Sequence, residues 1–151
     1  MSLGDPRKTC PHRATEVVFP DGTRVFASAS WIYRPEIAAD VALYLDETWA
    51  PYGSVIEWPD GGIPRNQDEA RRLIREAFAA ARDGRRVEVG CVAGHGRTGT
   101  VLACMSVLAG VPGDAAIEWV RDHYCSKAVE SGPQQDWILE FGRGVAASET
   151  P

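Results

Sequence analysis

Hydrophobic and polar positions along the middle of the chain follow the period of an amphipathic helix most clearly between residues 66 and 82. Asn66 is a favourable N-cap residue, and Glu69 three positions later completes a capping pattern. Gly84 supplies a stop signal. The apolar side chains recur every three or four positions, which predicts one buried face made of Leu73, Ile74, Ala77, Phe78 and Ala81.

Short apolar runs around this helix predict strands. Residues 54–58 precede the helix, and residues 87–91 follow it as a run that we expect to be buried. Residues 16–19 and 24–27 flank the turn sequence Pro-Asp-Gly-Thr, which predicts a hairpin. The apolar residues between positions 38 and 48 predict a short helix.

Helical patterns dominate the last third of the chain. Residues 98–109 predict an apolar helix, residues 114–124 predict a second, and Pro133 suits the first turn of a third. The order strand, helix, strand, helix in the middle predicts parallel strands joined by right-handed crossovers. We therefore expect an α/β fold with a central, mainly parallel sheet flanked by helices. One domain should span residues 1–151, with residues 1–14 loosely held.

Composition narrows the class of protein. A chain of 151 residues is long enough to bury one sizeable core. Its net charge of −5 argues against a broad nucleic-acid surface, which would need a basic face. No apolar run approaches the ~20 residues of a membrane span, and the N-terminus lacks an apolar signal core. These features predict a cytoplasmic protein without a membrane span.

The four cysteines show no tight pairing pattern. We expect Cys10, Cys91, Cys104 and Cys125 to be reduced, because a chain of this length does not need disulfides. Cys104 and Cys125 have the character of core residues. Cys10 and His12 resemble half of a metal site, but no second ligand pair has a suitable spacing. No metal or other cofactor is therefore expected.

The sequence C-V-A-G-H-G-R-T-G at residues 91–99 lies between the predicted strand and the apolar helix. Backbone N–H groups at a helix N-terminus bind phosphate. We expect Gly94, Gly96 and Gly99 to adopt positive φ angles and to turn these N–H groups inward. Cys91 would then lie beneath the anion site, where the thiolate form is favoured.

Three side chains in this segment suit phosphoryl transfer. A Cys91 thiolate is a competent nucleophile toward phosphorus. The planar Arg97 guanidinium matches two phosphate oxygens and stays charged. The Thr98 hydroxyl is placed to donate to the cysteine sulfur and to assist its departure from a phospho-cysteine.

This C-x-A-G-x-G-R-T-G pattern resembles the signature loop of the cysteine-dependent protein tyrosine and dual-specificity phosphatases. The resemblance implies that Cys91 attacks phosphorus, that Arg97 binds the phosphate, and that Thr98 assists hydrolysis. It also implies a phosphate-binding loop made of Val92, Ala93, Gly94, His95, Gly96 and Arg97. Arsenate reductases, rhodaneses and a smaller phosphatase fold also use cysteine anion loops, so a second motif is needed to discriminate.

The second motif is Trp58-Pro59-Asp60, in a loop rich in glycine and proline. It resembles the mobile acid loop of the same family, and it precedes the cysteine as the family order requires. In the smaller phosphatase fold the cysteine is near the N-terminus and the acid lies downstream. Asp60 would protonate the leaving oxygen and then activate water. Asp40 and Asp46 are rival acids on the predicted helix.

Further features of the resemblance, which covers roughly residues 54–141, are weaker. The segment around residue 130 resembles the place where relatives carry a residue that positions the hydrolytic water. Gln134 is our candidate, with Glu130 and Gln135 as alternatives. The chain also departs from the family, because Gly90 stands where relatives usually have histidine, and His95 occupies a variable loop position.

These residues predict a phosphomonoester hydrolase with a phospho-cysteine intermediate. Its substrate would be a phosphorylated protein, carrying phosphotyrosine or, with dual specificity, other phosphorylated residues. A phosphoprotein-binding module with weak catalysis is an alternative, motivated by Gly90. A phosphoinositide phosphatase is another, because a cationic His95 favours highly charged substrates. A sulfur-transfer or arsenate-reducing enzyme is less consistent with the sequence, because it has little use for Asp60.

Overall fold

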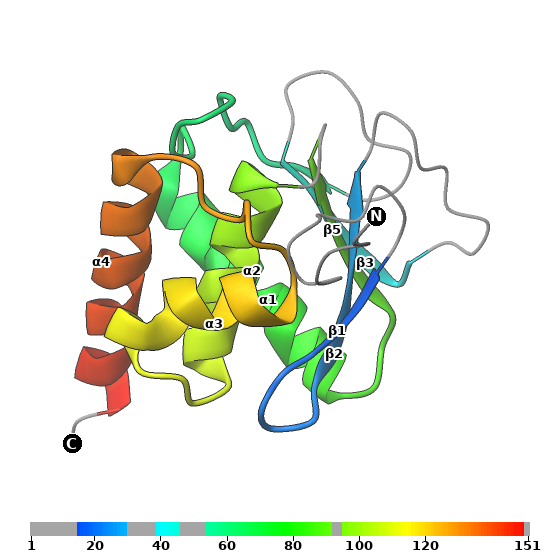
Figure 1. The fold of residues 1–151 in the computed structure, drawn as a ribbon. Helices are drawn as coiled ribbons and strands as arrows, with labels where there is room; N and C mark the ends of the chain where they lie inside the picture. The colour runs from blue at the N-terminus through cyan, green and yellow to red at the C-terminus, as the bar shows by residue number, and fades with distance from the viewer. Residues whose placement is uncertain (1–14, 30–38, 46–53, 92–94, 150–151) are drawn as a thin grey trace, which may run out of the picture.

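Five strands form one mixed sheet in the order β1-β2-β5-β3-β4 (Figure 1). The computed structural model describes residues 15–29, 39–45, 54–91 and 95–149. β1 and β2 are antiparallel, whereas β2, β5, β3 and β4 run parallel to one another. Because β5 has neighbours on both sides, it is buried along its whole length. The strands are β1 Thr15–Val18, β2 Arg24–Ala29, β3 Val41–Tyr44, β4 Ser54–Val55 and β5 Val87–Cys91.

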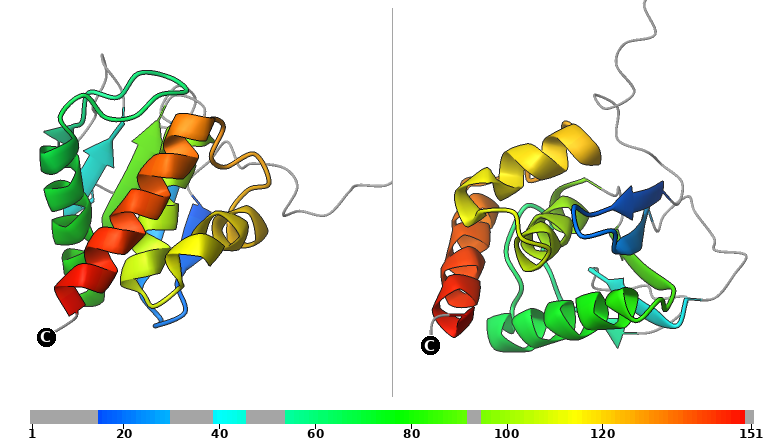
Figure 2. Two further views of the ribbon diagram at one scale, coloured as in Figure 1. Left: turned by 90° about the vertical axis from the view of Figure 1, so that its left-hand side faces the viewer. Right: turned by 90° about the horizontal axis from the view of Figure 1, so that it is seen from below.

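The helices gather on one side of this sheet, as Figures 1 and 2 show. Their apolar side chains join the inward-facing residues of the strands, among them Val25, Leu43 and Val89, in one hydrophobic core. The expected α/β fold is confirmed. The helical segments are α1 Gln67–Arg82, α2 Gly96–Leu108, the short 3₁₀ helix η2 Gly113–Ala115, α3 Ala116–His123 and α4 Gly132–Glu149.

The predicted hairpin is present as β1 and β2. The Phe19 and Thr23 backbones close the turn, with the Phe19 N–H donating to the Thr23 carbonyl at 2.8 Å. The Phe19 ring then packs edge-on against Phe78 of α1, at 5.3 Å between ring centroids, and stacks on Trp119 of α3 at 5.2 Å. The hairpin is therefore tied to two helices.

Helix α1 begins and ends where the sequence predicts. The Asn66 side chain accepts a hydrogen bond from the Glu69 N–H at 3.1 Å, and Gly84 adopts a φ of +85° just after the last turn. The buried residues of α1 include Ile74, Ala77, Phe78 and Ala81, as its periodicity predicts.

The helix predicted between residues 38 and 48 is wrong. Residues 41–44 form strand β3, which pairs with β5 and β4. Ala42, Leu43 and Tyr44 are all buried, so the strand carries a continuous apolar run rather than an alternating one. Such a short run has no periodicity that distinguishes a buried strand from a helix.

Other boundaries differ by smaller amounts. β4 is shorter than the strand predicted at residues 54–58. The helix predicted at residues 114–124 is divided into η2 and α3. Within the described parts of the chain, the helices are too short or too polar to cross a bilayer.

Candidate active site

The cysteine at position 91 is the last residue of the central strand β5, and α2 begins five residues later at Gly96. Ligand sites of parallel α/β sheets lie at the carboxyl ends of the strands, so the loop between β5 and α2 is well placed for one. Val92, Ala93 and Gly94, which we predict to bind phosphate, lie outside the described residues.

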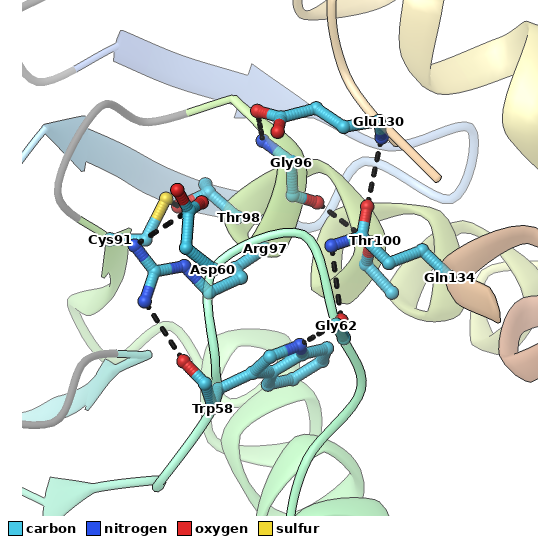
Figure 3. A network of polar contacts seen from close by, with 10 residues as sticks. All are labelled: Trp58, Asp60, Gly62, Cys91, Gly96, Arg97, Thr98, Thr100, Glu130 and Gln134. Atoms are coloured by element: carbon cyan, nitrogen blue, oxygen red, sulfur yellow. Dashed lines mark hydrogen bonds and ion pairs between the residues drawn. The ribbon is translucent and has the colours of Figure 1, made fainter. Parts of the chain in front are cut away.

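Cys91 and Thr98 are in direct contact, as predicted. The Thr98 hydroxyl donates a hydrogen bond to the Cys91 sulfur at 3.0 Å (Figure 3). Cys91 is 2% exposed and Thr98 is fully buried. A donor fixed on the sulfur stabilises negative charge there, both in a thiolate and in a departing thiolate.

Arg97 has an anchored edge and an open edge. Its Nη1 donates to the carbonyl oxygen of Trp58 at 2.9 Å. Its Nη2 lies 3.8 Å from Oδ1 of Asp60, and its buried Nε has no hydrogen-bond partner within the described part of the chain. Apart from the Asp60 carboxylate, no described residue engages the Nε–Nη2 edge, whose geometry matches two oxygens of a phosphate.

Asp60 stands at the corner of a tight turn. The Gly62 N–H donates to the Pro59 carbonyl at 2.9 Å, and Gly61 has a φ of +71°, which a glycine adopts without strain. This geometry leaves the Asp60 side chain 85% exposed, on the same side as the Arg97 guanidinium. The carboxyl group can therefore reach a substrate bound at Arg97.

Trp58 anchors this turn in the core. Its ring is fully buried and packs edge-on against Trp137 of α4, at 5.5 Å between ring centroids. Its Nε1 donates to the carbonyl oxygen of Gly62 at 2.6 Å, which joins the two ends of the turn.

Gly96 and Gly99 have a role that differs from the predicted one. The described glycines with positive φ are Gly22, Gly61, Gly84 and Gly110, so the expectation of positive φ at Gly96 and Gly99 is wrong. Both lie in α2, where another chain segment comes very close. A Cβ on Gly96 would be 2.7 Å from Cδ of Glu130, and one on Gly99 would be 2.5 Å from Cβ of Ala128.

Glu130 contacts the cysteine loop in a way that sequence reasoning did not find. Its Oε1 accepts a hydrogen bond from the Gly96 N–H at 3.1 Å. In turn, the Glu130 N–H donates to Oε1 of Gln134 at 2.8 Å. The opposite end of the Gln134 amide, Nε2, donates to the Gly62 carbonyl at 3.1 Å. No local spacing in the sequence signals these contacts, because they join three separate segments.

Close packing also explains why residue 90 is a glycine. A Cβ there would lie 2.5 Å from the Ser28 hydroxyl oxygen and 3.5 Å from the Tyr44 ring. The Tyr44 hydroxyl donates to the buried Glu88 carboxylate on the same face of the sheet. The space that a residue-90 side chain would need is thus filled by neighbours. His95 is partly buried, with Nδ1 3.7 Å from the Cys125 sulfur.

The remaining rival residues are distributed as follows. Asp40 is exposed and accepts a hydrogen bond from the Arg86 N–H at 2.8 Å, at the end of the sheet opposite Cys91. The expectation that Asp40 lies on a helix is wrong, because it directly precedes strand β3. Asp46 lies outside the described residues, and Gln135 lies on α4, partly buried.

The thiols differ in their surroundings. Cys91 and Cys104 are free. Burial raises the pKa of the Cys104 thiol well above its ordinary value, only partly opposed by Arg71, so Cys104 stays protonated. Cys125 is disulfide-bonded, so the expectation of a reduced thiol is wrong there. Spacing along the chain does not reveal such a bond, because tertiary structure decides which sulfurs meet.

Tyr124 lies close enough to respond to the charge of Cys91. Burial raises the pKa of its phenol, and negative charge on Cys91 adds to the rise. Tyr124 therefore remains a neutral group beside the cysteine.

Part of the chain matches a known protein family. A family model described as protein-tyrosine phosphatase matches residues 52–120, which include both loops. Two uncharacterized proteins of Methanocaldococcus jannaschii are also similar. One is 38% identical over 109 residues, covering 64% of this chain and 72% of that protein. The other is 35% identical over 144 residues, covering 87% of each chain.

Solved structures share the fold. The active form of Tk-PTP matches with a TM-score of 0.55 and 24% identity, over 70% of this chain and 79% of that chain. A mouse putative dual specificity phosphatase complexed with zinc tungstate matches with a TM-score of 0.59 and 17% identity, over 97% and 96% of the two chains. The predicted fold class is confirmed, and the family match supports the predicted superfamily.

Proposed function

We propose that this chain is a member of the cysteine-dependent protein tyrosine and dual-specificity phosphatase superfamily and that it hydrolyses phosphomonoesters through a phospho-cysteine intermediate. The grouping of four side chains supports the proposal. Thr98 contacts Cys91, and the neighbouring Arg97 lies beside Asp60, so that the proposed nucleophile, phosphate-binding group and acid lie close together (Figure 3).

In the first step, the Cys91 sulfur attacks phosphorus while the bond from phosphorus to the leaving oxygen breaks. The open edge of Arg97 binds two of the non-bridging oxygens and stabilises the charge that develops on them. Asp60, in its protonated form, gives its proton to the leaving oxygen, so that an alcohol or phenol departs.

In the second step, a water oxygen attacks the same phosphorus and the S–P bond breaks. The Asp60 carboxylate accepts the proton of that water, and inorganic phosphate is released. The hydrogen bond from Thr98 stabilises the departing Cys91 thiolate. For Gln134, a role in positioning this water stays a prediction.

The substrate that we propose is a phosphorylated protein, with phosphotyrosine as the preferred residue and dual specificity as the alternative. The family model supports the tyrosine phosphatase class. The exposed Asp60 carboxyl group supports a site that is open to a large substrate.

A turnover assay on phosphotyrosine, phosphoserine and phosphoinositide substrates tests this function. We expect the wild-type protein to release phosphate most rapidly from phosphotyrosine, and Cys91→Ser to release none. Full turnover by Cys91→Ser would refute the mechanism. Tight phosphopeptide binding by a wild-type protein without turnover would instead identify a binding module.

A further inference from the structure

Glu130 and Gln134 connect the two loops of the site through consecutive hydrogen bonds (Figure 3). The Glu130 carboxylate accepts from the Gly96 N–H, the Glu130 backbone N–H donates to the Gln134 amide, and that amide donates to the Gly62 carbonyl. We propose that they are positioning residues, which hold the acid turn against Arg97 by joining Gly62 to Gly96. We call this pair the Glu130–Gln134 bridge. The inference rests on the proposed phosphatase function, and it assigns to Gln134 a task other than positioning water.

The Glu130 end of the bridge is held firmly in place. Arg121 donates to the carbonyl oxygens of Ala128 and Val129, at 2.9 and 2.8 Å. Val129 has a φ of +64°, which a β-branched side chain adopts only where its surroundings enforce it. Gly99 allows the segment to touch α2. Glu130 therefore approaches the Gly96 N–H from a fixed direction.

The Gln134 end of the bridge is fixed by burial and by hydrogen bonds at both ends of its amide. Gln134 is fully buried, and both ends of its amide are in use: Oε1 accepts from Glu130 and Nε2 donates to the Gly62 carbonyl. A buried amide that loses a partner without solvent to replace it is costly. The Gly62 carbonyl also accepts from Trp58, so this single oxygen receives two donors.

The position of Asp60 follows from this arrangement. Asp60 lies between Trp58 and Gly62, and the Gly62 N–H closes the turn on Pro59. Arg97 holds the Trp58 end through the carbonyl of Trp58, while Gln134 holds the Gly62 end. Without the Gln134 bond, the Gly62 carbonyl keeps the Trp58 Nε1 donor but loses its second donor, which loosens this end of the turn. The Asp60 carboxyl then spends a smaller fraction of its time facing a phosphate bound at Arg97.

The bridge and the water-positioning role predict different kinetics. A misplaced acid slows the first step, and it does so most for substrates with a poor leaving group. A missing water-positioning group slows the second step equally for all substrates, and phospho-cysteine accumulates. Hydrolysis of phenyl phosphate, which needs the acid, compared with that of p-nitrophenyl phosphate, which needs it less, separates the two.

Gln134→Leu removes both hydrogen bonds, and Gln134→Glu keeps the acceptor for Glu130 but loses the donor to Gly62. We expect each variant to lower the ratio of the phenyl phosphate rate to the p-nitrophenyl phosphate rate by about three- to tenfold, the size of one lost hydrogen bond. Glu130→Ala should act in the same direction, and Glu130→Gln should restore the wild-type ratio because its amide oxygen still accepts from Gly96. Asp136→Asn is the control, since Asp136 is exposed on α4 and has no hydrogen bond or ion pair with the described residues.

Amide hydrogen exchange gives a readout that does not depend on turnover. We expect the Gly62 N–H to exchange about three- to tenfold faster in Gln134→Leu, and the Gly96 N–H to do so in Glu130→Ala but not in Glu130→Gln. If the wild-type protein shows no turnover, the proposed function fails. Amide hydrogen exchange then still tests whether the Glu130–Gln134 bridge holds Gly62 and Gly96 in place. Unchanged exchange in both variants, or an equal loss on both substrates with accumulation of phospho-cysteine, overturns it.

Discussion

The Thr98 hydroxyl donates to the Cys91 sulfur across 3.0 Å, and both side chains are closed off from solvent. A hydrogen bond to a charged partner contributes roughly 1.5–3 kcal/mol. We therefore expect Thr98→Ala to slow phospho-cysteine hydrolysis by roughly 10- to 100-fold. Rapid-quench measurement should show a burst of product followed by slow turnover. Thr98→Ser keeps the donor and should remain near the wild-type rate; a Ser variant as slow as the Ala variant would contradict the role of the hydroxyl.

Asp60 should carry the proton that the leaving group needs. Asp60→Asn is expected to slow phenyl phosphate hydrolysis by roughly 10²- to 10⁴-fold, and p-nitrophenyl phosphate hydrolysis by much less. Asp40→Asn is the matched control, because Asp40 lies at the opposite end of the sheet. Equal losses on both substrates would exclude Asp60 as the proton donor.

Gly99 should tolerate no side chain. A Cβ there would lie 2.5 Å from Cβ and 2.8 Å from Cα of Ala128, so the backbone of the facing segment would have to move. We expect Gly99→Ala to lower the free energy of unfolding by about 1–3 kcal/mol, measured by urea denaturation. Gly144→Ala on α4 is the control, since nothing lies within 4 Å of its Cβ position. That change should leave stability equal or slightly higher.

Asp21 should make stability depend on pH in the acid range. Partial burial alone would raise the pKa of its carboxyl, but hydrogen bonds from Thr23 and Arg82 outweigh burial and lower that pKa. A lowered folded-state pKa stabilises the protein above the ordinary value of about 4, and this contribution disappears as the pH falls through the folded-state pKa.

Asp21→Asn should therefore reduce the free energy of unfolding at neutral pH and have little effect near pH 2. The reduction should stay below about 1 kcal/mol, because Arg82 is half exposed and solvent screens the ion pair. Denaturation curves at several pH values check this expectation. A deficit that is the same at all pH values would show that the charge of Asp21 is not its cause.

Local signals in the sequence were sufficient to predict α1, the hairpin and the contact of Thr98 with Cys91. Asn66 caps α1 through a bond three residues away, and the hairpin turn is closed between Phe19 and Thr23. The contact of Thr98 with Cys91 follows from the short loop between β5 and α2. Each of these features depends on residues close together in the chain, whose chemistry is visible in the sequence.

Features that join distant segments were not visible there. Strand β3 was predicted as a helix, because burial between β4 and β5 removes the alternation that marks a strand. The contacts of Glu130 with Gly96 and of Gln134 with Gly62 join separate parts of the chain.

The sequence by itself predicted that Cys91, Arg97 and Asp60 share one site, because two motifs occur in the order that the resemblance requires, and the Arg97–Asp60 and Thr98–Cys91 contacts agree with that prediction. Tertiary structure alone decided what surrounds them. Gly90, Gly96 and Gly99 lack side chains because neighbouring segments occupy the space. Their role is close packing, which depends on where remote residues lie after folding, and no local pattern carries that information.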